Sequence, residues 1–562
     1  MRKDFLTSHG ILLWTPLIFA LSALATACGT KGDQAAQAAP LAVEVLDAEG
    51  ASLGSVAFPV SCSEEASGHM RLGLALLHNM TYSEAAGAFR AASDADPNCA
   101  LAYWGVAMTY VHPLWPDVPS GEDFERGWTL LQKAREVAPK TPREEAYVTA
   151  LEAYYRDWQS RDESARLASY AAAWQQVSAD YPNDPEAALF RSLSLRATAS
   201  GLDQTFKTEI EAAEIAERIL QQIPDHPGAH HYIIHSYDVP SLAERALPVA
   251  RSYGKVAPDN SHALHMTSHI FTRLGLWEES IHFNARAAQA ALKHPINGAT
   301  SPHYLHAMDY LAYAHLQRGH DEEAQRVFDQ LKALSGPVVD HAASAYAFAA
   351  VPARIALEQQ RWSEAAKLSS RWPTTISWDR FPHLEAIPEF ARALGAAHTG
   401  DMKTARRSAA RLRALQSQAA AMPSAYDWGI QVEIQEVAAR AWIAYAEGRT
   451  EGGLTLMRQA ADLESTTQKN PVTPGEVLPA GELLGDMLLD QDRYDEARAA
   501  YDAALERSPN RFNSLYGAGR AAELAGAKET AANYYRQLSA LAAESGGKRP
   551  RLEHATKFLS GE

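Results

Sequence analysis

Hydrophobic residues recur every three to four positions along most of this chain, which is the period of amphipathic helices. These stretches run for about 10 to 18 residues and alternate with short segments rich in Pro, Gly, Asn and Asp, which end helices and form turns. Only from Ala42 to Pro59 do apolar and polar residues alternate, and this predicts a short β-hairpin. We therefore predict an all-α chain with one hairpin near its start.

The helical segments contain an internal repeat. One copy consists of Gly485, Leu488, Tyr494, Ala497, Tyr501, Ala504 and Pro509. A shift of 34 residues reaches Gly519, Ala531 and Tyr535 in the same roles, and the spacing recurs at Gly73, Leu76, Tyr82, Ala85, Phe89, Ala92 and Pro97. Small residues let two antiparallel helices approach, aromatic residues fill the gap, and proline ends the second helix. The repeat therefore predicts a series of helical hairpins.

This pattern resembles the tetratricopeptide repeat (TPR) superfamily. The resemblance implies an α-α solenoid of about ten to twelve hairpins from residue 62 to residue 545, with a concave groove lined by the first helix of each pair. Several strings also resemble a family of exported bacterial TPR proteins without an established activity. They are Pro97–Gly105, His230–Asp238, His262–Gly275, Pro471–Pro479 and Glu482–Asp486. This narrower resemblance bears on architecture and compartment and supplies no reaction.

The N-terminus has the form of an export signal. Arg2 and Lys3 precede an apolar run, and Ala25-Thr26-Ala27-Cys28 resembles the lipobox of bacterial lipoproteins. That resemblance implies a signal peptide over residues 1–27, lipidation of Cys28 and, from Gly29, an outer-membrane lipoprotein that faces the periplasm. A plain secretory signal is the alternative. Residues 28–61 would form a lipid-anchored flexible linker with the short hairpin, and residues 546–562 a C-terminal tail.

The two remaining cysteines, Cys62 and Cys99, would lie in a compartment that permits disulfides. A bond between them would contribute about 3–4 kcal/mol to stability on the chain-entropy model. Two free thiols are the alternative. A thiolate metal site is disfavoured because no further cysteine supplies the other ligands.

Charge excludes one class of partner. The 562 residues include 52 basic and 68 acidic side chains, a formal net charge of −16, and no basic stripe stands out. Such a surface repels phosphate backbones, so we do not expect nucleic acid as a partner. A lipid anchor would be the only contact with a membrane.

Ten of the 21 histidines lie between His230 and His306. They occur in phase: His231, His235 and Asp238 share one helix face, as do His262, His265 and His269, and then His306, Asp309 and Tyr313. In the frame of the resemblance, these positions face the groove from three adjacent helices. Neighbouring helices lie roughly 8–10 Å apart, so their imidazoles can meet around one ion. His230 and His303 lie off this stripe.

Imidazole and carboxylate groups are the ligands that Zn, Cu(II), Ni and Fe prefer. The predicted metal ligands are His231, His235, Asp238, His262, His265, His269, His306 and Asp309. Eight candidates exceed one coordination sphere, so some would orient ligands or bind a second ion. Hydrogen-bonded structural histidines are one alternative. Peptide recognition by the imidazoles with Tyr304, Tyr310 or Tyr313 is another.

A catalytic role of the predicted metal site is a further alternative. An ion with few protein ligands could activate water, with Asp238 or Asp309 as base. No HExxH, GxSxG or P-loop motif occurs in the chain. The loop from His112 to Pro116 either covers the groove as a lid or is a surface loop with a buried tryptophan.

We interpret the chain as an exported TPR lipoprotein whose groove binds a transition metal, for trafficking, structure or catalysis. The alternative is a metal-free TPR scaffold that binds a peptide or partner protein in the cell envelope. Metal content distinguishes the two.

Overall fold

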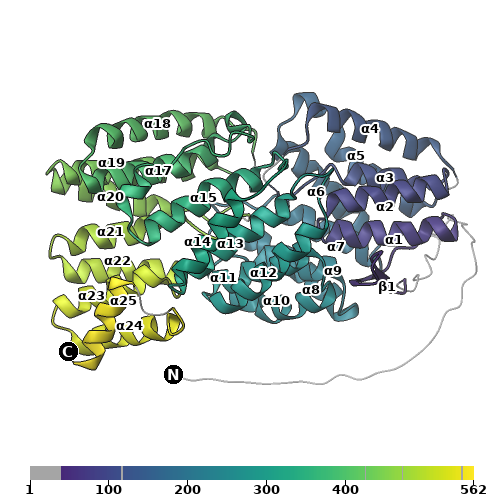
Figure 1. Cartoon of the computed structure of the whole chain (residues 1–562). Helices are drawn as coiled ribbons and strands as arrows, with labels where there is room; N and C mark the ends of the chain where they lie inside the picture. Colours follow the sequence, from purple (N-terminus) through teal and green to yellow (C-terminus); the bar gives the residue numbers. More distant parts are fainter. Residues whose placement is uncertain are drawn as a thin grey trace, which may run out of the picture. The chain divides into compact units, whose positions relative to one another are not determined.

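The computed structural model describes residues 40–115, 118–138, 140–424, 426–470, 472–545 and 549–561. Within them the chain is helical apart from one hairpin, so the predicted all-α class is confirmed (Figure 1). The predicted signal peptide and Cys28 lie outside the described residues. No helix among the described residues is long and apolar enough to cross a membrane.

The helices follow one another with short connections. Those before the middle of the chain are α1 (Glu64–His78), α2 (Tyr82–Ala95), α3 (Ala100–Met108), α4 (Gly121–Glu136), α5 (Pro142–Tyr155), α6 (Glu163–Asp180), α7 (Pro185–Ala197), α8 (Lys207–Gln222), α9 (Pro227–Tyr237), α10 (Ala243–Val256), α11 (Ser261–Arg273) and α12 (Trp277–Lys293). The later ones are α13 (Pro302–Gln317), α14 (Asp321–Lys332), α15 (Ala342–Glu358), α16 (Trp362–Ala365), α17 (Pro382–Thr399), α18 (Met402–Ala420), α19 (Trp428–Ala446), α20 (Thr450–Ser465), α21 (Ala480–Leu489), α22 (Tyr494–Arg507), α23 (Phe512–Leu524), α24 (Lys528–Leu541) and α25 (Pro550–Ser560). Two 3-10 turns cover Trp158–Ser160 and Trp378–Arg380. Helix α25 occupies the segment predicted as a C-terminal tail.

Consecutive helices make the most extensive contacts (Figure 1). The repeat residues explain how they come so close. Phe89 on α2 packs against Gly73 on α1 and Gly105 on α3, and a Cβ atom at either glycine would lie within 2.6 Å of its ring. Tyr501 on α22 packs in the same way between Gly485 and Gly517. Each aromatic ring therefore needs glycine on both neighbouring helices.

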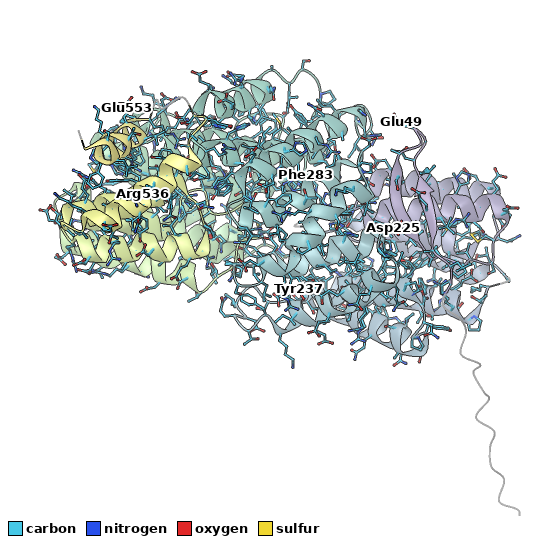
Figure 2. All side chains as sticks on the ribbon, turned by 90° about the horizontal axis from the view of Figure 1, so that it is seen from below. Glu49, Asp225, Tyr237, Phe283, Arg536 and Glu553 are labelled. Carbon is cyan, nitrogen blue, oxygen red and sulfur yellow. A yellow bond between two sulfur atoms is a disulfide. The ribbon has the colours of Figure 1, made fainter. Side chains whose placement is uncertain are left out.

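The hairpin is antiparallel and consists of β1 (Val43–Leu46) and β2 (Ser52–Val56). It is held to the loop between α8 and α9 at Asp225, which Figure 2 labels beside the strands. The Ser55 amide donates to the Asp225 carbonyl oxygen over 3.1 Å, and the Ser55 hydroxyl donates to its carboxylate over 2.6 Å. A disulfide joins Cys62, just before α1, to Cys99 at the start of α3.

Other contacts join helices that are far apart in the sequence. Helix α13 packs on α23, and the Trp277 indole donates to the Asn510 carbonyl oxygen over 2.8 Å. Arg511, at the start of α23, is fully buried and pairs with Glu358 of α15 and Glu482 of α21 over 2.7 and 3.0 Å. The C-terminal helices are therefore tied to the middle of the chain by a buried ionic cluster.

Candidate metal centre

The predicted histidines lie on α9, α11 and α13. Proline occupies the first turn of α9 and α13, where its missing N–H costs nothing, and the Asn260 side chain caps α11 by accepting from the Ala263 amide. Helix α11 packs against both α9 and α13, and every residue of α11 is buried. The imidazoles of the three helices are therefore enclosed between helices.

The structure places all eight predicted ligand residues in the interior, none more than 7% exposed. It brings the six histidines together in two groups. The first triad is His231, His235 and His262, and the second triad is His265, His269 and His306. Within each triad one ring nitrogen of each residue lies within 4.8 Å of the other two.

Hydrogen bonds define the tautomers in the second triad. His265 Nδ1 lies 2.8 Å from Asn284 Oδ1, and the Asn284 amide nitrogen donates to the Ser280 carbonyl oxygen, which sets the orientation of the amide. His265 therefore carries its hydrogen on Nδ1. His269 Nδ1 lies 3.0 Å from the Asp238 carboxylate, so it too must be the protonated nitrogen.

The consequence is that two acceptors face each other. His265 Nε2 and His269 Nε2 are 3.0 Å apart, and in the neutral rings neither carries a hydrogen. Two lone pairs at this distance repel unless a cation lies between them. Burial lowers the pKa of both imidazoles, although Asp238 partly opposes this at His269, so a shared proton is disfavoured at neutral pH.

In the first triad, a backbone carbonyl group orients the His231 ring. His231 Nδ1 donates to the His78 carbonyl oxygen over 2.6 Å, which leaves the lone pair on Nε2. That Nε2 lies 3.3 Å from His262 Nε2. A backbone carbonyl that fixes the tautomer of an imidazole is the usual support behind a metal ligand.

The first triad also contains unsatisfied nitrogens. Both ring nitrogens of His235 and the Nδ1 of His262 are buried without a hydrogen-bond partner among the described residues. Buried polar atoms of this kind are rare because each costs the free energy of its lost hydration. Burial lowers the pKa of His231 to about 3 and those of His235 and His262 well below the usual value. These rings are therefore neutral, which is the form that binds metals.

The two aspartates lie outside the triads. Asp238 accepts from His269, from Lys469 Nζ over 2.6 Å and from Arg273 Nε over 3.2 Å, and these cations hold its pKa far below the usual range despite burial. We assign Asp238 to the orientation of His269. Asp309 lies 3.4 Å from Arg354 Nε, and burial raises its pKa to about 6. Neither aspartate belongs to the groups of described residues whose ligand atoms lie close enough together to share an ion.

A third group, absent from the sequence-based prediction, consists of His78, Glu186 and His226. Glu186 accepts from both imidazoles, from His78 over 2.8 Å and from His226 over 3.1 Å. The other nitrogen of His226 accepts from the Gly228 amide, and that of His78 lies 2.8 Å from the Tyr232 hydroxyl. Every donor here meets an acceptor, so we assign this group to the structural core. No helical phase joins these residues, because Glu186 lies 108 positions after His78 and 40 positions before His226.

Trp115 covers the triads from the loop after α3. Its ring centroid lies 5.6 Å from that of His262 and 5.8 Å from that of His306. It also contacts His303, the off-stripe histidine, and His341. The Trp115 ring therefore lies over the histidines, in the position of a lid.

We expect Trp115→Ala to speed the loss of bound metal to an external chelator by roughly tenfold, because the apolar cover that limits access to the site is removed. Release is measured by mixing metal-loaded protein with a chromogenic chelator. Trp128→Ala removes a half-buried tryptophan from α4, outside the histidine-bearing helices, and should leave the rate unchanged. Equal rates in the two variants would rule out a lid at Trp115.

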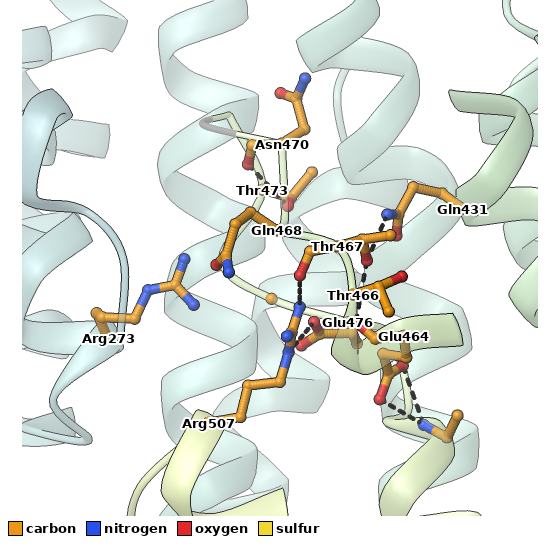
Figure 3. Close-up of polar contacts among 12 residues, drawn as sticks. Arg273, Gln431, Glu464, Thr466, Thr467, Gln468, Asn470, Thr473, Glu476 and Arg507 are labelled. Carbon is orange, nitrogen blue, oxygen red and sulfur yellow. Dashed lines mark hydrogen bonds and ion pairs between the residues drawn. The ribbon is translucent and has the colours of Figure 1, made fainter. Parts of the chain in front are cut away.

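The segment between α20 and α21 packs against the same region. Lys469 from this segment reaches Asp238, and the Arg354 guanidinium donates to the carbonyl oxygens of Gly475 and Glu476. Figure 3 shows how Arg507 holds the segment by donating to the Thr467 carbonyl oxygen and to the Glu476 carboxylate, over 2.6 and 3.1 Å. A segment remote in sequence thus supplies a charged group beside the second triad.

No protein-family model matches the chain, and no curated protein shows significant similarity to it.

Proposed function

We propose that this protein binds transition-metal ions through the two adjacent histidine triads on α9, α11 and α13. The observation that carries the proposal is the 3.0 Å contact between His265 Nε2 and His269 Nε2, whose hydrogens are both required on Nδ1. A metal ion converts this contact from repulsion between lone pairs into shared coordination. The unpartnered nitrogens of His235 and His262 support the same interpretation for the first triad.

The dimensions fit an ion. Two nitrogens that each lie about 2.1 Å from one metal are at most about 4.2 Å apart. One nitrogen pair in each triad, at 3.0 and 3.3 Å, is within this limit, and the third imidazole of each triad has a nitrogen within 4.8 Å of the others. Three neutral imidazoles suit Zn, Cu(II), Ni and Fe, and three protein ligands leave one tetrahedral position for water or another molecule.

The contacts favour metal over peptide binding. Tyr304, Tyr310 and Tyr313, the residues expected to hold a peptide, are all buried. The Tyr310 hydroxyl lies 3.4 Å from His269, and that of Tyr313 accepts from Arg511 over 2.8 Å. A peptide would have to displace the chain's own helices and the segment that carries Lys469 to reach them.

X-ray absorption spectroscopy of the zinc-loaded protein tests this proposal. We expect only nitrogen and oxygen neighbours at about 2.0–2.1 Å, with the outer-shell scattering that imidazole rings produce. A spectrum without imidazole scattering would contradict the assignment, because every ligand in both triads is a histidine.

We also propose the wider setting: a TPR-type solenoid exported as a lipoprotein. The lipobox-like Ala25-Thr26-Ala27-Cys28 and the Cys62–Cys99 disulfide support export, since disulfides persist in oxidising compartments. The matching placement of Phe89 and Tyr501 between glycines supports a repeat of helical hairpins. On this proposal, the metal site faces the periplasm from a lipid-anchored protein of the outer membrane.

A further inference from the structure

A cavity of about 100 Å³ lies next to the two triads. It has room for several water molecules or a small organic molecule. Its walls come from the Trp115 loop, from α7 and the loop that follows it, from α8, and from the segment that carries Lys469. Asp238 and Trp115 also line it, so two residues that contact the histidines border this cavity as well.

Two cations from different parts of the chain line the cavity, Arg196 of α7 and Lys469. Arg196 Nε donates to the His235 carbonyl oxygen over 3.0 Å, and this bond uses one of the five N–H donors of a guanidinium. Lys469 donates to Asp238, which uses one of its three donors. Both groups thus have donors in excess of these hydrogen bonds.

The same wall carries a buried carboxyl group. Glu209, in the first turn of α8, is 4% exposed, and its Oε2 has no hydrogen-bond partner in the described part of the chain. A buried carboxyl oxygen without a donor loses its hydration without replacement. A molecule in the cavity that donates a hydrogen bond would satisfy this oxygen.

The cavity has a net charge of one positive once two of its carboxylates are paired with arginines behind the wall. The lining carries two cations, Arg196 and Lys469, and three carboxylates, Glu163, Glu209 and Asp238. Arg273, which is not among the lining residues, pairs with Asp238 at 3.2 Å. Glu163 also lines the cavity but is neutralised by Arg166 at 2.6 Å. A ligand with one negative charge and one neutral donor complements this wall.

We propose that the cavity binds a small monoanionic hydroxy acid. Its carboxylate lies between Arg196 and Lys469, where charge-assisted hydrogen bonds are strong. Its hydroxyl group donates to Glu209 Oε2. The binding residues belong to the cavity alone, so binding does not require a metal ion; with the triads loaded, the hydroxy acid lies beside the metal centre.

Calorimetric titration with three molecules of one carbon skeleton tests the proposal: lactate, propionate and alanine. We expect lactate to bind at least about tenfold more tightly than propionate, because a hydrogen bond to a charged group is involved. Lactate should also bind more tightly than alanine, whose ammonium group adds a positive charge to a positive cavity. Equal binding of lactate and propionate, or tighter binding of alanine, would overturn the proposal.

Two variants locate the binding site. Arg196→Met should abolish lactate binding, whereas Arg191→Met, which removes a surface ion pair with Glu211 from the same helix, should not. Ala199→Phe fills the cavity without changing a charge and should also abolish binding, which keeps the test valid if Arg196→Met does not fold. Lactate binding that survives in folded Arg196→Met or in Ala199→Phe would place the ligand elsewhere and overturn the proposal.

Each titration is run on metal-free and on zinc-loaded protein. Lactate binding to the metal-free protein supports the proposal that residues of the cavity hold the ligand, whether or not the triads contain metal. If lactate binds only when zinc is present, the ligand is held by the ion and the proposed contacts with Arg196 and Glu209 are wrong. The two proposals can therefore fail separately.

Discussion

Replacing His265 and His269 together with alanine is expected to reduce the metal bound per chain by about half. The double variant removes two of the three ligands of the second triad, and His306 alone cannot hold an ion. The first triad keeps its three imidazoles and the hydrogen bond from His231 to the His78 carbonyl oxygen. Bound metal is measured by elemental analysis after dialysis against metal-free buffer.

The matched control is His383→Ala. His383 on α17 is 4% exposed, and both of its ring nitrogens are buried without a hydrogen-bond partner among the described residues, as in the case of His235. It belongs to neither triad, so its loss should leave the metal content unchanged. If the double variant keeps its full metal content, or if His383→Ala loses as much, the assignment of the second triad is wrong.

Arg511→Met is expected to lower the free energy of unfolding by about 3–5 kcal/mol. The variant leaves Glu358 and Glu482 buried without their cation, although Gln317, Asn513 and Ser514 still donate to them. Denaturant unfolding of the variant and of the unchanged protein measures the difference.

Arg536→Met provides the control for this experiment. Arg536 is an exposed residue of α24, and its removal should change the unfolding free energy by no more than about 0.5 kcal/mol. An equally small change for Arg511→Met would contradict the view that the ionic cluster ties the C-terminal helices to α13, α15 and α21.

Local patterns predicted most of the helices because each element depends on residues within a turn or two. The repeat spacing also predicted that an aromatic residue fills the gap beside a small residue of the preceding helix, as Phe89 does at Gly73 and Tyr501 at Gly485. The glycines of the following helices, Gly105 and Gly517, were not part of that prediction. The segment after residue 545 was predicted as a tail, yet it contains α25. Its Pro550 and the preceding small residues favour a helix start as well as a break.

Helical phase predicted which histidines share a face, and the structure brings those six together. Helical phase could not predict which residues form hydrogen bonds with each imidazole ring. Asp238 is in helical phase with His235, but its carboxylate pairs with Arg273 and Lys469. Lys469 lies 231 positions after Asp238 in the sequence. The tautomers of His231 and His265 likewise depend on His78 and Asn284 on other helices. Contacts of this kind exist only in the folded chain.

Elemental analysis of residues 29–562, produced without a histidine tag and purified without chelators, tests the central claim most directly. We predict about one transition-metal ion for each triad, or about two per chain, retained through gel filtration. A protein free of Zn, Cu, Ni and Fe, even after the folded chain has been incubated with each ion, would contradict the claim.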